Sequence, residues 1–127
     1  MITDAMGKGL VVAVYFSAHW CPPCKKFTPI LTEFYKQANA SGKVLEIIFC
    51  SSDKSEGEFN NYAASMPWIS LPWNKKSEGD GLASKLGVRG IPALFVMNGD
   101  LSSCNPKGRN DVTGGKTPGE VVKVWKG

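Results

Sequence analysis

Cys21 and Cys24 are the residues of this chain whose type and spacing point most directly to chemistry. Two thiols separated by two residues can close a small disulfide ring. If the first lies just ahead of a helix and the second in its first turn, the first is at the positive end of the helix dipole, which favours the thiolate. The thiolate is the nucleophile of thiol–disulfide exchange, so the pair predicts a redox site.

Two other interpretations of the cysteine pair are a zinc half-site and two incidental thiols. A structural zinc site usually takes a second pair of ligands at similar spacing. The other cysteines, Cys50 and Cys104, are isolated from each other, and the only histidine is His19. We therefore favour the redox interpretation and expect no metal ion.

The segments on either side of the cysteines have the patterns of a strand and a helix. Residues 10–16 are continuously apolar and rich in β-branched side chains, which is typical of a strand buried on both faces. Apolar residues then recur at helical spacing over residues 27–38, where Pro29 should kink an amphipathic helix. A strand, Cys-x-x-Cys and a helix in this order form the context in which the motif indicates disulfide exchange.

Local signals predict the remaining elements. The expected strands cover residues 44–49, 93–97 and 101–104, the last two joined as a hairpin, and the expected helices begin near Ser55, Gly79 and Thr117. The middle helix should stop at Gly87, and residues 106–116 should form a loop. Strands alternating with helices predict parallel crossover units, and the hairpin adds an antiparallel pair, so we expect an α/β fold.

Length and composition indicate an ordinary globular protein. The chain has 127 residues, of which 43% are hydrophobic and 20% charged, so we expect one domain over residues 1–127. No apolar run approaches the length of a membrane span, and residues 1–9 lack the pattern of a signal peptide. Four cysteines are too few for a disulfide scaffold, which favours the cytoplasm, with the nucleus as the alternative.

The basic side chains argue against nucleic acid as a partner. The formal net charge is +4, but the lysines are spread along the chain and form no basic run with interleaved aromatics. A solvated, mildly basic surface is the simpler interpretation. Such a surface favours neutral or acidic partners.

Four sequence blocks resemble the tryparedoxin and nucleoredoxin family of thioredoxin-like proteins. They are YFSAHWCPPCKKFTP at residues 15–29, MPW at 66–68, LP at 71–72 and GIP at 90–92. The blocks occur in the family's order and spacing and cover roughly residues 6–111. The resemblance implies a thioredoxin fold, with a central mixed sheet flanked by helices and shortened at the N-terminus, and dithiol–disulfide oxidoreductase activity.

The resemblance also implies roles for the site residues. Cys21 is the attacking nucleophile, and Cys24 resolves the mixed disulfide. We expect Cys21 to be exposed ahead of the helix and Cys24 to be partly covered in its first turn. Pro22 and Pro23 suit the start of a helix, because the first helical amides have no intrahelical partner.

The segment Ile91-Pro92 is the second expected part of the site. In the resembling family this peptide bond is cis and faces the cysteine pair, which leaves the backbone of Ile91 open to an extended substrate segment. The alternative is a trans proline that merely begins a strand. The expected substrate-binding residues are Trp20, Pro22, Ile91, Pro92 and Arg109.

Other side chains near the motif have two interpretations each. Trp20 should form an exposed rim over Cys21 rather than part of the core. As a cation, His19 could favour the thiolate, but a solvated loop histidine fits equally well. Lys25 and Lys26 either add positive potential or form the wet face of the helix.

Two positions depart from better-known patterns. Tyr15 stands where the common thioredoxins carry a buried acid, as it does in the resembling group, so proton transfer to and from Cys24 must use another group or water. Ser52-Asp53-Lys54 stands where tryparedoxins carry Trp-Asp-Glu, which favours nucleoredoxins and weakens any site for a cationic dithiol.

The residues and the resemblance together predict a monomeric reductase of protein or small-molecule disulfides. It needs no metal or organic cofactor, but it needs an external electron donor, either a flavoprotein reductase or a low-molecular-weight dithiol. An oxidase or isomerase with the same residues is one alternative. A redox-dependent binding module is the other, although the intact cysteine pair argues against it.

Overall fold

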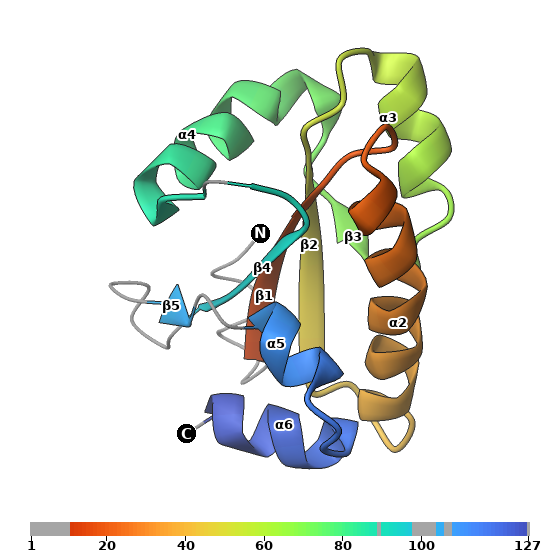
Figure 1. Cartoon of the computed structure of the whole chain (residues 1–127), viewed down its shortest axis with the longest axis vertical. Helices are drawn as coiled ribbons and strands as arrows, with labels where there is room; N and C mark the ends of the chain where they lie inside the picture. Colours follow the sequence, from red (N-terminus) through yellow and green to blue (C-terminus); the bar gives the residue numbers. More distant parts are fainter. Residues whose placement is uncertain (1–10, 89, 98–103, 106–107, 127) are drawn as a thin grey trace.

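The computed structural model describes residues 11–88, 90–97, 104–105 and 108–126. Its centre is a five-stranded sheet of order β3-β2-β1-β4-β5 (Figure 1). The strands are β1 Val11–Ser17, β2 Leu45–Ser51, β3 Ile69–Ser70, β4 Ala93–Met97 and β5 Cys104–Asn105.

Strand β1 is the middle of this sheet and leads directly into the cysteine motif. It pairs in parallel with β2, with Val11 opposite Leu45, and antiparallel with β4, with Tyr15 opposite Leu94. Every residue of β1 is buried, as its continuous apolar pattern predicts. The sheet is therefore mixed, and the expected thioredoxin-type α/β architecture is confirmed.

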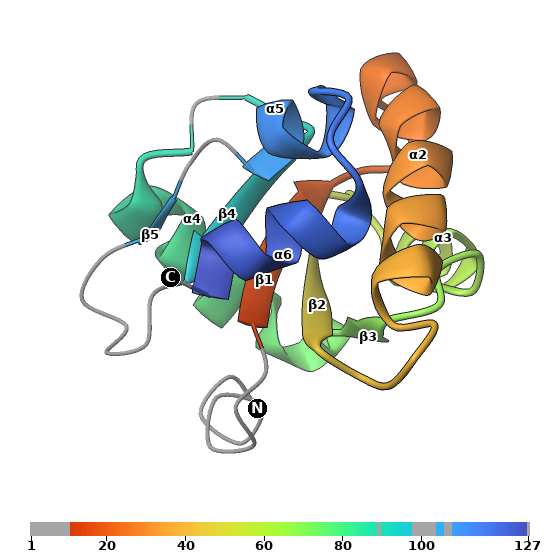
Figure 2. The same cartoon turned by 90° about the horizontal axis from the view of Figure 1, so that it is seen from below.

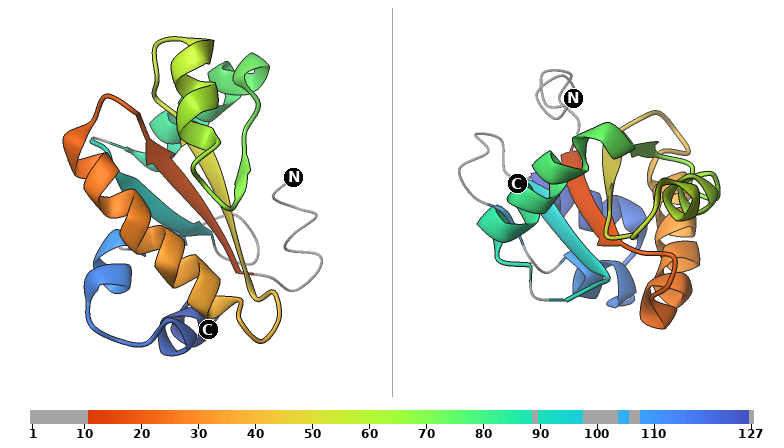
Figure 3. Two further views of the ribbon diagram at one scale, coloured as in Figure 1. Left: turned by 90° about the vertical axis from the view of Figure 1, so that its right-hand side faces the viewer. Right: turned by 90° about the horizontal axis from the view of Figure 1, so that it is seen from above.

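The helices cover both faces of the sheet (Figures 2 and 3). They are α2 Pro22–Ala38, α3 Glu56–Ala63, α4 Lys76–Leu86, α5 Gly108–Thr113 and α6 Pro118–Lys126, with a short 3-10 turn, η1 Trp73–Lys75, before α4. One core joins alternate residues of β1, such as Tyr15, to α2, α3, α5 and α6. The other core joins the intervening residues, such as Val14, to α4.

Local sequence signals explain where several helices begin and end. The Ser55 hydroxyl accepts a hydrogen bond from the backbone N of Glu58 at 3.2 Å, as expected for a capping residue ahead of α3. Helix α4 ends at Gly87, whose φ of 74° is a left-handed conformation that glycine adopts without strain. Helix α2 runs through Pro29 to Ala38, as predicted.

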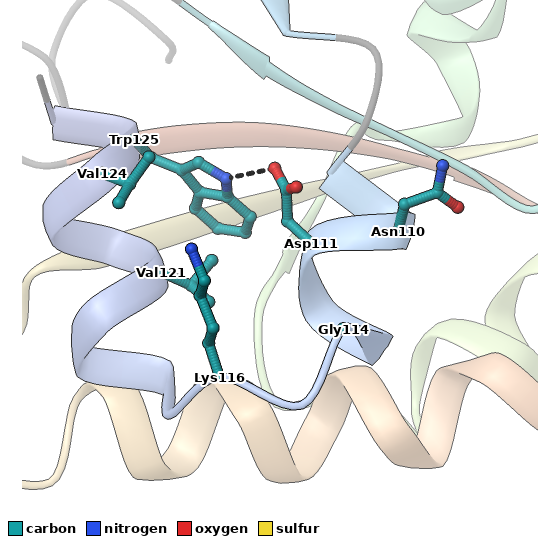
Figure 4. A pocket seen from close by; sticks show the side chains of 7 residues that line it. All are labelled: Asn110, Asp111, Gly114, Lys116, Val121, Val124 and Trp125. Atoms are coloured by element: carbon teal, nitrogen blue, oxygen red, sulfur yellow. Dashed lines mark hydrogen bonds between the residues drawn. The ribbon is translucent and has the colours of Figure 1, made fainter.

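The prediction of a loop over residues 106–116 is wrong, because helix α5 lies within it. Helix α5 packs tightly on β4: a Cβ at Gly108 would lie 2.7 Å from the carbonyl oxygen of Leu94. Its Val112 is buried, and the Asp111 carboxylate accepts a 2.9 Å hydrogen bond from the Trp125 indole of α6, across the small pocket in Figure 4. Tertiary contacts therefore impose a helix on a segment of loop-like composition.

Two further details refine the expectations. The sequence did not predict strand β3, which is only two residues long. The return strand expected over residues 101–104 begins outside the described part of the chain, but Cys104 opposes Met97 in the antiparallel pair of β4 and β5. Among the helices described, none is long and apolar enough to cross a membrane.

Candidate active site

Cys21 is the N-cap of helix α2. Its backbone is extended, with φ −96° and ψ 109°, and its sulfur accepts a hydrogen bond from the backbone N of Cys24 at 3.4 Å. Pro22 and Pro23 occupy the first turn and have no amide hydrogen, so the Cys24 amide is the first that this turn offers to the sulfur. Together with the helix dipole, this hydrogen bond favours a negative charge on the Cys21 sulfur.

Both thiols of the pair are covered, which corrects the expectation of an exposed Cys21. The side chain of Cys21 is only 5% exposed and that of Cys24 is 0% exposed. Ile91 packs against the pair, and its carbonyl oxygen lies 3.7 Å from the Cys21 sulfur. Cys21 is still the outer thiol, because Cys24 lies one turn inside the helix.

The environment of Cys24 keeps it protonated at neutral pH. Burial, and to a smaller extent the hydrogen bonding with Cys21, raise the pKa of its thiol to about 11. The neighbouring Ser17 hydroxyl and Ala18 backbone offset part of this rise in the pKa. Cys24 must therefore lose a proton before it can act as a nucleophile.

The Ile91-Pro92 peptide bond is cis, as the resemblance implies, and the alternative of a trans proline is wrong. Pro92 is buried, and Ile91 is partly buried with its carbonyl facing Cys21. The structure thus brings this segment and the cysteine pair together, although they are 70 residues apart in the chain.

Trp20 forms the exposed rim that its position predicts. Its side chain is 51% exposed, and its indole N donates a 3.2 Å hydrogen bond to the carbonyl oxygen of Ser52. The Lys54 ammonium lies 5.8 Å from the centre of the Trp20 ring, within cation–π distance. Lys54, which the resemblance to tryparedoxins singled out by its charge, therefore lies against the rim of the site.

Asp53 is a site residue whose role the sequence did not indicate. Its carboxylate is buried and accepts 2.7 Å hydrogen bonds from the backbone N of His19 and from the Ser51 hydroxyl. The backbone N of Ser52 also donates to the carbonyl of Ser17 at 2.9 Å. These bonds tie the loop after β2 to the loop that carries Cys21.

Four buried hydroxyl groups lie behind the cysteines. The hydroxyl of Thr28 is 2.7 Å from that of Tyr15 and 2.8 Å from that of Tyr62, and the Tyr62 hydroxyl is 2.7 Å from that of Ser17. We call these residues, Tyr15, Ser17, Thr28 and Tyr62, the hydroxyl cluster. Only Tyr15 was singled out from the sequence.

The remaining candidates have smaller or undescribed roles. Lys25 and Lys26 are exposed, and the exposed His19 ring meets the Tyr62 ring edge-on at 6.0 Å. Arg109 lies in α5, but its side chain is outside what the structure describes.

Cys50 is buried, as predicted for a small apolar side chain. Burial raises the pKa of its thiol to about 12. No group of three or more metal-ligating residues occurs within the described ranges.

A cysteine pair at the start of a helix, facing a cis-proline that directly precedes β4 of a mixed sheet, defines a thioredoxin-type redox site. A family model for thioredoxin-like proteins matches residues 9–102, and the chain belongs to this family. The Cys21–Cys24 pair sits in the family's active-site position.

Individual relatives agree with the resemblance drawn from the motifs. The chain is 37% identical to nucleoredoxin of Danio rerio over 105 residues, which cover 83% of this chain and 25% of that protein. It is 42% identical to tryparedoxin of Trypanosoma brucei brucei, over 75% of this chain and 65% of that protein. The chain thus spans about a quarter of the length of the nucleoredoxins it matches.

A solved structure gives the same result for the fold. Tryparedoxin I from Leishmania major superposes with a TM-score of 0.79 at 41% identity, covering 87% of this chain and 76% of that one. The resemblance to the tryparedoxin and nucleoredoxin group is confirmed.

Proposed function

We propose that this protein reduces disulfides of protein substrates, with Cys21 as the nucleophile and Cys24 as the resolving thiol. The observation that carries the proposal is the asymmetry of the pair. The Cys21 sulfur caps a helix N-terminus, whereas the Cys24 thiol is fully buried and its pKa is raised to about 11. Cys21 is thus suited to attack the substrate, whereas Cys24 stays protonated until the resolving step.

The reaction has two exchange steps. In the first, the Cys21 thiolate attacks one sulfur of the substrate disulfide; a Cys21–substrate bond forms and the other substrate sulfur leaves as a thiolate that takes a proton from solvent. In the second, Cys24 loses its proton and attacks the Cys21 sulfur. The Cys21–Cys24 disulfide forms, the second substrate thiolate leaves, and two electrons have passed to the substrate.

The substrate segment would lie between Trp20 and the cis-proline segment. An extended chain can pair with the backbone beside Pro92, as in strand addition, and this would bring its disulfide to Cys21. The support is the placement of Ile91 against Cys21 and the exposure of Trp20. Pro22 is exposed within the motif, and Arg109 joins this set from the resemblance alone.

The electron donor is an external flavoprotein reductase or a low-molecular-weight dithiol. One structural neighbour, a tryparedoxin II that is 35% identical, was solved in complex with glutathionylspermidine. In this chain Lys54 lies against Trp20 at the rim, so a positive charge already occupies that edge. We therefore propose that a cationic dithiol is a poor donor here.

The proposal includes a single-domain monomer in the cytoplasm or nucleus that needs no cofactor of its own. The low number of cysteines and the buried Cys50, which has no disulfide partner among the described residues, support the location alone.

An insulin-reduction assay tests the function. With dithiothreitol as donor, the protein should accelerate the precipitation of insulin B chain, and Cys21→Ser should abolish the acceleration. A protein that binds insulin without accelerating its reduction would be a binding module instead. The equilibrium potential against glutathione separates a reductase from an oxidase or isomerase, because the latter have higher potentials.

A further inference from the structure

An open groove lies beside the cysteine motif. Its volume is about 520 Å³, and residues of helices α2 and α3 line it. We call it the α2–α3 groove, and its lining includes His19, Lys25, Thr32, Asn61, Tyr62 and Ser65. Sites that hold a ligand usually have volumes of about 300–1,000 Å³, so the groove has room for a few residues of a peptide rather than for a single ion.

The groove is next to the expected nucleophile. His19 precedes Cys21 by two residues, and Lys25 directly follows the second cysteine of the motif. The buried Asp53 carboxylate accepts from the His19 backbone N at 2.7 Å, and the His19 ring lies edge-on to the Tyr62 ring at 6.0 Å. A substrate whose disulfide has reached Cys21 can therefore place its neighbouring residues in this groove.

The charge of the lining has one sign. Among the described residues that line the groove, Lys25 contributes a positive charge and none is acidic. Glu33 of α2 and Glu58 of α3, which are close to lining residues in the sequence, do not line it. Lys54 adds a second positive charge at the rim, beside Trp20. The groove and its rim thus complement a negatively charged partner.

The lining also offers hydrogen-bonding groups that the protein does not use itself. Within the described part of the chain, Lys25 has no ion-pair partner, and the side chains of Thr32 and Asn61 make no hydrogen bond. An amide side chain both donates and accepts, as the backbone of a bound peptide requires. The Ser65 hydroxyl donates to the Tyr62 carbonyl at 2.6 Å and can still accept from a ligand.

We propose that the α2–α3 groove binds an acidic segment of the protein substrate, so that disulfides flanked by glutamate or aspartate are preferred. The inference rests on the proposed disulfide exchange at Cys21 and names the class of substrate. A carboxylate of the segment pairs with the Lys25 ammonium, and the backbone of the segment bonds to Asn61 and Thr32.

Reduction of matched synthetic peptides tests this assignment. Each peptide contains one disulfide loop, flanked on both sides by glutamates or, in the matched peptide, by glutamines. With dithiothreitol as donor, kcat/KM is measured for both and divided by the rate of the same peptide with dithiothreitol alone. The ratio of the two corrected values should favour the glutamate peptide about fivefold, and high salt should lower this ratio.

Two pairs of neighbouring residues provide variants and their matched controls. Lys25→Glu should remove the preference, because it replaces an attraction by a repulsion. Lys26→Glu changes the net charge equally, but Lys26 does not line the groove, so at least half of the preference should remain. Asn61→Trp fills the groove without a change in charge and should lower the ratio to about one. Asn60→Trp, at an exposed position outside the lining, should keep it.

Three results would overturn the assignment of the groove. They are equal corrected rates for the two peptides with the unmodified protein, an equal loss of preference in Lys25→Glu and Lys26→Glu, and an unchanged ratio in Asn61→Trp. Each can occur while the glutamine peptide is still reduced, so failure of this inference is distinguishable from failure of the proposed function. Reduction of neither peptide would overturn the proposed function itself.

Discussion

The two thiols of the motif differ because of the positions that helix α2 gives them. Cys21 caps the helix and is held by the Cys24 amide, whereas Cys24 is closed off from water. The same residue type is thus placed where charge is favoured and where it is not.

Alkylation should report this difference. Iodoacetamide at pH 7.5 should label Cys21 first in the reduced protein. Cys24 and Cys50 should remain unlabelled over the same time, because the pKa values of their thiols are raised to about 11 and about 12 and neither sulfur caps a helix. Peptide mass spectrometry locates the label. Earlier labelling of Cys24 or Cys50 would show that the roles are assigned wrongly.

The raised pKa of Cys24 also predicts how the stability of the reduced protein depends on pH. The pKa rises from 9.0 to about 11 on folding, so between these values the folded protein keeps a proton that the unfolded chain releases. The free energy of unfolding should therefore be insensitive to this group below pH 9 and fall as the pH rises towards 11. Cys50 acts in the same direction.

Urea unfolding under reducing conditions at pH 8, 9.5 and 10.5 measures the effect. Cys24→Ser is the control, because it removes one titrating thiol and leaves all other groups. Its stability should fall less steeply than that of the parent over this interval. Parallel curves for the two proteins would contradict the account of Cys24.

Among individual residues, the sequence predicted those that are recognisable by their type and spacing. They are the cysteine pair, the exposed Trp20 and the cis Pro92. It did not predict the hydroxyl cluster. Ser17 ends β1 and Tyr62 lies in α3, 45 residues further along the chain, and only the packing of α3 against the sheet brings their hydroxyls together (Figure 1). Serine, threonine and tyrosine carry no spacing signal for such a contact.

Among the elements, the loop after β2 positions the active-site loop. Asp53 makes the decisive contacts, because its carboxylate accepts from the backbone of His19 and from Ser51. Without it, two partly buried donors lose their acceptor.

Asp53→Ala should therefore lower the free energy of unfolding by about 1–3 kcal/mol and slow the reaction of Cys21 with Ellman's reagent. Asp53→Asn keeps one acceptor oxygen and should cost less. Lys54→Ala, at an exposed neighbour, should leave stability almost unchanged. Urea unfolding and stopped-flow kinetics provide the two readouts. If Asp53→Ala is as stable and as reactive as Lys54→Ala, the loop does not position the site.

Helix α5 shows the limit of prediction for elements. Strands and long helices were predicted because their apolar periodicity repeats over several turns or residues. Residues 108–113 offer only one clear apolar side chain, Val112, and are helical because Gly108 fits against Leu94 and Asp111 holds Trp125. These partners are distant in the sequence, so composition alone indicated a loop.

For the whole molecule, the charge supports the proposal that a cationic dithiol is a poor donor. The net charge is +4, and Lys54 lies beside Trp20 at the position where the resemblance implies an acid in tryparedoxins. A surface charge pair contributes about 1 kcal/mol or less, and reversing an acid to a base replaces an attraction with a repulsion, so the change costs roughly a factor of ten in affinity.

Reduction by trypanothione should accordingly be slow, and Ser52→Trp combined with Lys54→Glu should accelerate it. High salt should narrow the gap, because surface charges are screened. Lys26→Glu, an exposed lysine on α2, is the matched charge reversal and should have a smaller effect. The rate of reduction by trypanothione is measured for each protein at low and at high ionic strength. Fast reduction of the unmodified protein, unaffected by salt, would contradict the proposal for the donor.

The central claim is that Cys21 attacks the substrate and Cys24 releases it. Trapping with Cys24→Ser tests it most directly, by incubation with a disulfide-bonded protein and peptide mapping of the adduct. We expect a stable mixed disulfide at Cys21 that dithiothreitol cleaves, and no adduct with Cys21→Ser. An adduct at Cys24 of the Cys21→Ser protein, or none at Cys21 in Cys24→Ser, would contradict it.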